Sequence, residues 1–216
     1  METVFNIFIK DGAWLTILKG LSATVQISAL SLLFGTLLGA GICFLRTSNF
    51  KPAKVFAKIY ISVIRGSPVL MLLMLLFYGV FARTDLEPMT IAVITFAMHT
   101  AAYVAEILRS ALMAVDTGQV EAARTLGFSK IQAFKLVTFP QITKIAKPVY
   151  QSTVINLIQW TSVVGYVSIT DLTRVINNTA ARTMQPMITI IGGMIIYLAI
   201  SYVVNGIFNY TDKNKV

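Results

Sequence analysis

Five long stretches of this 216-residue chain contain no charged residue. These uncharged windows are 26, 17, 18, 23 and 29 residues long and cover 20–45, 66–82, 88–105, 148–170 and 183–211. About 20 apolar residues in a helix cross the hydrocarbon core of a bilayer, and a basic residue at the end of a shorter window can reach the headgroups. The pattern therefore predicts an all-α membrane protein with five transmembrane helices.

We expect a single transmembrane domain over residues 1–216, because no Gly/Ser linker and no repeat of solenoid period divides the chain. The predicted spans, extended into flanking residues, are 16–45, 58–82, 88–112, 148–170 and 185–209. The first twenty residues carry four charges and contain no short apolar core before a cleavage site. We therefore expect no cleaved signal peptide.

The low charge content excludes two broad classes of protein. Charged residues make up 12% of the chain, about half of the roughly 25% in a soluble domain, which argues against a soluble globule and against disorder. The net charge of +9 would suit a nucleic-acid partner, but in so apolar a chain it indicates membrane orientation instead. Cys43 is the only cysteine, so an intramolecular disulfide and a paired-cysteine metal site are excluded.

The basic residues predict which side of the membrane each connection faces. With five spans, one side receives 13 Lys/Arg and 4 Asp/Glu in segments 46–65, 106–147 and 212–216. The other side receives 5 of each sign in segments 1–19, 83–87 and 171–182. Because cytoplasmic loops carry the excess of basic residues, we expect the N-terminus outside and the C-terminus in the cytoplasm.

Small residues and a proline predict how the spans pack and bend. Gly35 and Gly39 form a small-xxx-small pair that lets a second helix approach closely. Residues 65–68 read Arg-Gly-Ser-Pro, and the proline interrupts the second span because it lacks an amide hydrogen. Glu106 and Arg109 lie three residues apart on one helix face, which predicts a structural ion pair.

No pattern of catalytic residues is found in the sequence. There is no Gly-x-x-x-x-Gly-Lys-[Ser/Thr] loop, so the chain itself should bind no ATP. His99 is the only histidine, which excludes a paired-histidine metal site, and a Ser-His-Asp triad would lack any nucleophile motif. An intramembrane histidine indicates either a functional site or a hydrogen bond to a neighbouring helix, and the sequence leaves both open.

The cytoplasmic segment over residues 116–140 contains the most specific pattern in the chain. It reads Glu-Ala-Ala-Arg-Thr-Leu-Gly over 121–127 and, after nine residues, Val-Thr-Phe-Pro over 137–140. Ala122 and Ala123 would give a short helix a thin side that fits a groove on another protein. Gly127 can adopt a positive φ and end that helix, and Pro140 can start the next one. An ordinary amphipathic connector on the membrane surface is the alternative.

On these residues the chain resembles the permease subunits of bacterial ATP-binding-cassette (ABC) importers. The spacing Glu-Ala-Ala-x₃-Gly-x₉-Ile-x-Leu-Pro is similar to their cytoplasmic coupling motif, with Val137 and Phe139 as conservative departures. Residues 101–109, Ala-Ala-Tyr-Val-Ala-Glu-Ile-Leu-Arg, and residues 118–123, Gly-Gln-Val-Glu-Ala-Ala, are similar to motifs of the polar amino-acid uptake branch. The resemblance covers about residues 16–208 and implies the type I ABC importer permease fold.

The resemblance also implies a function and a set of partners. The chain would be a non-enzymatic permease subunit in the bacterial cytoplasmic (inner) membrane, importing a polar amino acid by alternating access. Two cytoplasmic ATPase subunits, which would bind ATP and magnesium, would dock on the coupling segment. A second permease subunit would complete the path, and an extracytoplasmic solute-binding protein would deliver the substrate; the chain itself would need no cofactor. The implied coupling residues are Gly118, Glu121, Ala122, Ala123, Gly127 and Pro140.

Polar side chains inside the uncharged windows are candidates for the substrate path, because a zwitterion needs polar partners in hydrocarbon. The candidates are His99, Tyr103, Asn156, Gln159, Trp160, Thr161 and Ser162, and interhelical hydrogen bonding is the alternative for each of them. The pair Gln159-Trp160 stands where many members of this family have Lys-Asp. With no strong charge in the windows, we expect a polar or weakly charged amino acid rather than a strongly cationic one.

Two other classes of membrane protein are weighed against this interpretation. An ion-coupled secondary transporter needs titratable groups near the middle of the bilayer, whereas the windows contain no carboxylate and a single histidine. A passive channel or membrane scaffold would not need the Glu-Ala-Ala-x₃-Gly segment. Co-purification with an ATPase would separate all three classes.

Overall fold

The computed structural model describes residue 7 and residues 13–213, and no strand occurs in this part of the chain. The helices are α2 (Ala13–Thr47), α3 (Lys51–Gly66), α4 (Val69–Leu75), α5 (Pro88–Met113), α6 (Thr117–Thr125), α7 (Lys130–Ala133), α8 (Phe139–Trp160), α9 (Leu172–Thr183) and α10 (Pro186–Lys213). Two π-helical segments, η2 (Leu76–Val80) and η3 (Phe134–Thr138), and a 3₁₀ segment, η4 (Thr161–Val167), complete the set. Two predictions concern the start of the chain: that the N-terminus lies outside and that no signal peptide is cleaved. Residues 1–6 and 8–12, to which they apply, lie outside the described residues, and so does the tail 214–216.

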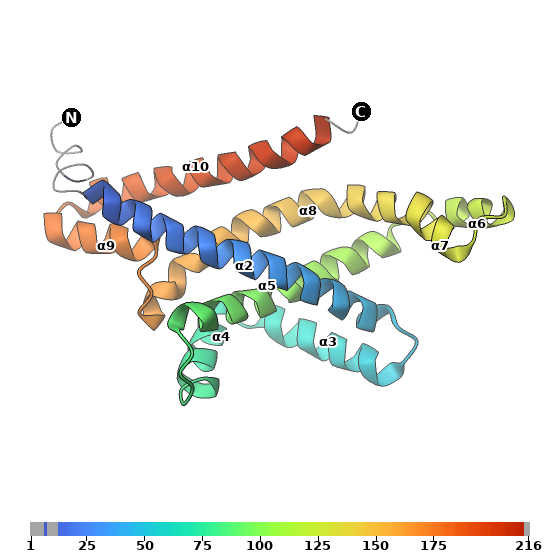
Figure 1. Ribbon diagram of the computed structural model, residues 1–216, viewed down its shortest axis with the longest axis horizontal. Helices are drawn as coiled ribbons and strands as arrows, with labels where there is room; N and C mark the ends of the chain where they lie inside the picture. Colours follow the sequence, from blue (N-terminus) through green and yellow to red (C-terminus); the bar gives the residue numbers. More distant parts are fainter. Residues whose placement is uncertain (1–6, 8–12, 214–216) are drawn as a thin grey trace.

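The long helices run along the length of the molecule (Figure 1). They are α2, α5, α8 and α10, and α4 turns away from their common direction. The short helices α6 and α7 lie together at one end of the molecule, beyond the ends of α2 and α10, whereas α9 lies at the opposite end (Figure 1). The connections predicted to be cytoplasmic, between α2 and α3 and between α5 and α8, therefore lie toward the same end.

The closest helix packing joins α2 to α5, and two glycines make it possible. A Cβ atom on Gly35 would lie 2.8 Å from the Cβ atom of Thr100, and one on Gly39 would lie 2.7 Å from that of Val104. Both distances are shorter than van der Waals contact, so only glycine fits at either position. The predicted close approach at the small-xxx-small pair is confirmed.

The break in the second predicted span is also confirmed. α3 ends at Gly66, α4 begins at Val69, and the two segments are bent by 107°. Pro68 precedes α4 with a φ of −60° and a ψ of 131°, an extended conformation that directs the chain out of α3. The residues predicted as one span over 58–82 therefore form two helices, the first of which starts earlier, at Lys51.

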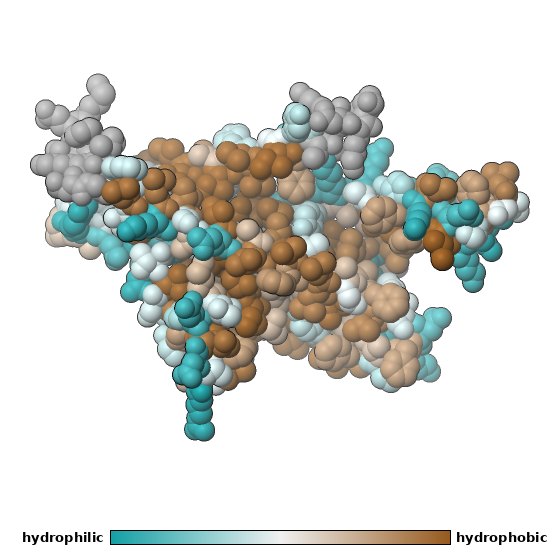
Figure 2. All heavy atoms as spheres, in the orientation of Figure 1, coloured by the Kyte–Doolittle hydropathy of each residue, from teal (hydrophilic) through white to brown (hydrophobic). Residues whose placement is uncertain are grey.

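Among the described helices, α2, α5 and α10 are each long and apolar enough to cross a membrane, and α3 with the α4–η2 segment qualifies as a bent pair. α8 lies outside this set, and its sequence combines Lys144 and Lys147 with many uncharged polar residues. It starts at Phe139 rather than near residue 148, and η4 follows it from Thr161. Apolar side chains cover the middle of the molecule, with polar residues gathered at its ends (Figure 2).

Pro140 lies in the first turn of α8, as the sequence predicts, although no break separates α8 from the helical segment before it. The chain is helical without interruption from Lys130 to Trp160, and the π-helical segment η3 immediately precedes Phe139. A proline inside a helix removes one hydrogen bond and crowds the preceding turn, and a wider π turn accommodates both effects.

Candidate coupling segment and substrate path

Both ends of α6 are fixed by hydrogen bonds that its sequence specifies. The backbone N–H of Gly118 donates to the Asp116 carboxylate at 2.9 Å, which caps the start of the helix. Gly127 has a φ of +90°, as the sequence predicts. Its N–H donates to the carbonyl of Arg124, and the N–H of Phe128 donates to the carbonyl of Ala123, each at 3.1 Å. These two bonds form a Schellman motif and end α6.

α6 is held against the following helix. The side chains of Gln119 and Gln141 are joined by a hydrogen bond of 3.0 Å between α6 and α8. Ser129 and Gln132 form a capping box at the start of α7, so the chain turns back directly after Gly127. The segment from Asp116 to Gln141 is thus a compact helical hairpin rather than an extended connector.

The two alanines of the coupling motif face in different directions. Ala123 is only 5% exposed and is the buried residue of α6, whereas Ala122, Glu121 and Gly118 are exposed. Ala123 therefore packs inside this chain and is not free to enter a groove on a partner, contrary to the expectation. The exposed thin side of α6 is provided by Gly118 and Ala122.

Large apolar side chains are exposed on the segments that follow α6 in the chain. Leu126 is 79% exposed, Ile131 68% and Leu136 63%. We call these three residues the apolar tip. Since they lie at the end of the molecule with α6 and α7, the apolar tip indicates a surface that contacts another protein.

Three candidates for the substrate path come together between α5 and α8. The ring centroids of His99 and Trp160 are 4.6 Å apart in an edge-to-face arrangement, and Tyr103 lies 5.1 Å from His99 and 5.2 Å from Trp160. His99 is 3% exposed, and its Nδ1 atom has no hydrogen-bond partner among the described residues. The hydrogen bond to a neighbouring helix that the sequence left open is therefore not found at Nδ1.

A cavity of about 630 Å³ adjoins this aromatic cluster. Arg65, Tyr103, Glu106, Ser152 and Asn156 contribute its polar lining from α3, α5 and α8. Ser152 and Asn156 therefore share a face, as their spacing predicts.

Glu106 forms the predicted ion pair with Arg109, whose Nε donates to the Glu106 carboxylate at 3.0 Å. The two side chains are about one-quarter exposed, so the pair lies at the surface of the chain rather than in its core. The predicted ion pair is therefore confirmed.

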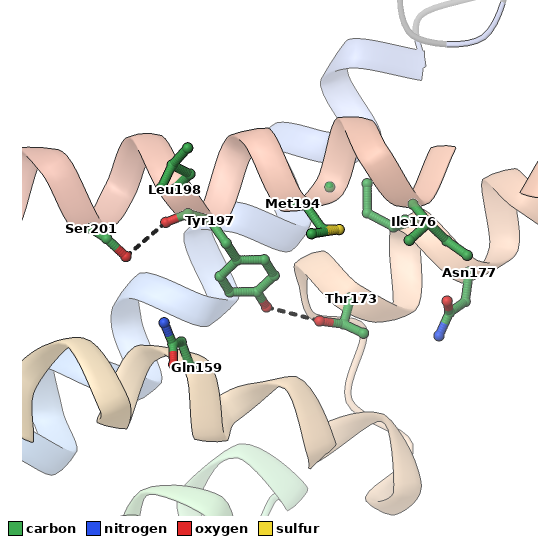
Figure 3. A pocket seen from close by; sticks show the side chains of 10 residues that line it. Gln159, Thr173, Ile176, Asn177, Met194, Tyr197, Leu198 and Ser201 are labelled. Atoms are coloured by element: carbon green, nitrogen blue, oxygen red, sulfur yellow. Dashed lines mark hydrogen bonds between the residues drawn. The ribbon is translucent and has the colours of Figure 1, made fainter. Parts of the chain in front are cut away.

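The remaining path candidates do not continue the same face. Gln159 lines a different pocket of about 390 Å³ between α8, α9 and α10. In Figure 3 Gln159 lies opposite Tyr197, whose hydroxyl is hydrogen-bonded to Thr173 at 2.8 Å. Ser162 lines a further pocket next to α9, and the buried Thr161 donates its hydroxyl hydrogen to the carbonyl of Ile158.

Two residues that the sequence analysis did not select have clear roles in this arrangement. Arg65 places its guanidinium carbon 4.9 Å from the centroid of the Tyr103 ring, a cation–π contact that spacing along the chain does not reveal. Asp171 is fully buried and caps α9 by accepting hydrogen bonds from the N–H groups of Thr173 and Arg174. Burial raises the pKa of the Asp171 carboxyl, although these backbone hydrogen bonds oppose the shift. An aspartate directly before a helix was the available signal.

Comparison with known families identifies this arrangement. Residues 22–215 match the family described as the inner membrane component of binding-protein-dependent transport systems. The chain belongs to this family. It is an importer permease subunit with the type I ABC permease fold, and in this family ATP hydrolysis is carried out by separate subunits.

Individual relatives extend over nearly the whole chain. The probable amino-acid ABC transporter permease protein YckA of Bacillus subtilis (strain 168) is 32% identical over 213 residues, which is 98% of this chain and 94% of the relative. The L-cystine transport system permease protein TcyL of the same organism is 32% identical over 99% of this chain and 92% of its own. The glutamate/aspartate import permease protein GltK of Escherichia coli O157:H7 is 30% identical over 91% of this chain and 92% of its own.

Solved structures show the same fold. A crystal structure of an amino acid ABC transporter with histidines matches with a TM-score of 0.82 and 31% identity, over 92% of this chain and 94% of that one. The MetNI methionine ABC transporter, in an inward-facing conformation, matches with a TM-score of 0.78 over 96% of this chain and 100% of that one. Its identity of 18% supports the fold alone.

Proposed function

We propose that this chain carries a polar amino acid across the bacterial cytoplasmic membrane by alternating access, as one permease subunit of an ATP-driven importer. Relatives named for L-cystine and for glutamate and aspartate, and a solved amino acid transporter with histidines, support an amino-acid substrate. The absence of carboxylates and strong cations from the uncharged windows favours a polar or weakly charged amino acid.

In the proposed topology the single domain crosses the membrane five times, with the N-terminus outside and the C-terminus in the cytoplasm. α2, the bent α3–α4 pair, α5, α8 and α10 supply the crossings. The basic connections between α2 and α3 and between α5 and α8 then face the cytoplasm together with α6 and α7. The common position of these connections toward one end of the molecule supports this orientation.

The exposed face of α6 is the observation that carries the proposal for coupling. Gly118 and Ala122 give this face small side chains, Glu121 adds a negative charge, and the apolar tip follows α6 in the chain. Two cytoplasmic ATPase subunits, which hold the ATP and magnesium, would bind one such face on each of two permease subunits. Ala123, Gly127 and Pro140 would keep the hairpin in shape instead of touching the ATPase.

The mechanism follows from this arrangement. An extracytoplasmic binding protein delivers the amino acid near the end formed by α9. Closure of the two ATPases moves the α6 hairpins together and opens the path between the permease subunits to the outside. ATP hydrolysis then resets the path toward the cytoplasm, and this chain performs no covalent chemistry.

Two experiments test the proposal. The chain should co-purify with an ABC ATPase from its native membrane, and purification with no ATPase at stoichiometric amount would contradict the assignment. In a Cys43→Ser background, exposed single cysteines at Asp85 and Asn178 should react in intact cells with a membrane-impermeant thiol reagent. A cysteine at Lys130 should react only after the cells are opened, and its labelling from outside would invert the topology.

A further inference from the structure

Arg65 occupies an unusual place in the fold. It lies in the last turn of α3, immediately before the 107° bend to α4. Its side chain is exposed, and its guanidinium group stacks on the ring of Tyr103 from α5. Among the described residues no carboxylate lies within ion-pair distance of Arg65. The guanidinium is therefore held in position by an aromatic ring, and its five N–H donors remain open to a ligand.

The cavity beside Arg65 has the size and lining of a small-molecule site. Its volume of about 630 Å³ falls within the roughly 300–1,000 Å³ usual for ligand pockets. The ring of Tyr103 forms one wall, and the apolar side chains of Ile107 and Val149 form others. Ser152 and Asn156, both exposed on α8, add a hydroxyl and an amide. The cavity thus combines one cation, uncharged polar groups and apolar walls.

The two charged groups that line the cavity differ in whether they are free to bind a ligand. Glu106, the carboxylate in the lining, is already bound to Arg109 through its ion pair and side-chain hydrogen bonds. Arg65 attracts Glu106 only at longer range and forms no ion pair with it, so the guanidinium of Arg65 has no direct anionic partner among the described residues. A cation at membrane depth is costly unless an anion pairs with it, and the planar guanidinium matches a carboxylate through two parallel hydrogen bonds.

We propose that Arg65 binds the carboxylate of the transported amino acid in this cavity, while the side-chain oxygens of Ser152 and Asn156 accept hydrogen bonds from its ammonium group. This assignment rests on the proposed function, since it assumes an amino-acid substrate. It makes Arg65 a specificity-determining residue, because a compound that keeps the ammonium group but lacks the carboxylate leaves the guanidinium unpaired.

The test compares Arg65→Gln and Arg65→Lys with the matched control Lys58→Gln. Lys58 is an exposed cation on the same helix but does not line the cavity. Each purified complex is reconstituted with saturating binding protein, and ATP-dependent uptake is measured with a mixture of the twenty radiolabelled standard amino acids, then with the one that the wild type carries. Arg65→Gln should lower uptake about tenfold or more, Arg65→Lys should retain part of it, and Lys58→Gln should stay within about twofold of the wild type. ATP hydrolysis without substrate should be unchanged in Lys58→Gln.

A binding measurement separates recognition from assembly. The complex without binding protein is titrated with the carried amino acid, in competition with the amine that lacks its carboxylate. The amine should compete at least about tenfold more weakly with the wild type, and this preference should disappear in Arg65→Gln. Equal competition by the amine, or Arg65→Gln uptake equal to that of Lys58→Gln, would overturn the role of Arg65. If the wild type took up none of the twenty amino acids, the proposed function would fall and this assignment with it.

Discussion

Ala122 and Ala123 are neighbours in α6, yet Ala122 is exposed while only 5% of Ala123 is. A bulky side chain at Ala122 should therefore disturb a partner, and the same change at Ala123 should disturb the α6 hairpin itself. We expect Ala122→Trp to fold and insert normally while its affinity for the ATPase falls about tenfold, which corresponds to about 1.4 kcal/mol. Ala123→Trp should lower the amount of folded permease in the membrane.

Two measurements check this difference. Pull-down of the ATPase reports docking, and fluorescence-detected size-exclusion chromatography of the detergent extract reports folding. If Ala122→Trp bound the ATPase as well as the wild type does, the exposed face of α6 would not be the docking surface.

Gly127 offers a test of backbone conformation without a change in packing. A Cβ atom there would have no atom within 4 Å, but the φ of +90° is unfavourable for other residues. Gly127→Val should therefore destabilise the hairpin by about 1–2 kcal/mol. Gly127→Asn should destabilise it less, because asparagine tolerates positive φ. Substrate-stimulated ATP hydrolysis should follow the same order. Equal loss in the two variants would indicate a contact of Gly127 with the partner instead.

The α2–α5 interface can be tested with a matched pair of glycines on one helix. A Cβ atom on Gly39 would lie 2.8 Å from the carbonyl oxygen of Ala101, whereas one on Gly41 would have no atom within 4 Å. Gly39→Leu should lower the free energy of unfolding of the purified permease by about 1–3 kcal/mol through overpacking, and its melting temperature should fall accordingly. Gly41→Leu should leave it nearly unchanged, and equal melting temperatures for the two variants would contradict the close packing.

The buried carboxyl of Asp171 makes the stability of the folded permease depend on pH. Burial raises its pKa in the folded state above the ordinary value near 3.9, so the folded state binds the proton more tightly. Its stabilising contribution is fully present below the unfolded pKa and is lost as the pH rises through the folded pKa. Asp171→Asn keeps an oxygen for capping but does not titrate. The melting temperature of Asp171→Asn relative to wild type should therefore be higher at pH 7 than at pH 4, and a reversed order would contradict the shift.

The sequence predicts a structural feature correctly where the chemistry of one residue type determines the backbone. The bend at Pro68, the positive φ of Gly127 and the close packing at Gly35 and Gly39 follow from the chemistry of proline and glycine. The apolar windows likewise predict α2, α5 and α10, because a long uncharged stretch has few alternatives in a membrane protein.

The features that the sequence did not predict depend on contacts between helices or on the exact ends of a helix. α8 starts at Phe139 and includes Lys144 and Lys147. The predicted span is bounded by charged residues, so it places the start of this helix too late, at residue 148. The burial of Ala123 depends on how α6 folds back on η3, which the spacing of the motif does not contain. Asn156 and Gln159 are close on one helix but face different pockets: α3 and α5 line the pocket beside Asn156, and α9 and α10 line the pocket beside Gln159.

The most direct measurement is uptake by liposomes that contain the purified complex of this chain with its ATPase. ATP is supplied on the side of α6 and the binding protein on the opposite side, with a radiolabelled amino acid as the probe. Accumulation against a gradient is expected only when both ATP and binding protein are present. Accumulation driven by a proton or sodium gradient without ATP, or simple equilibration without either, would contradict it.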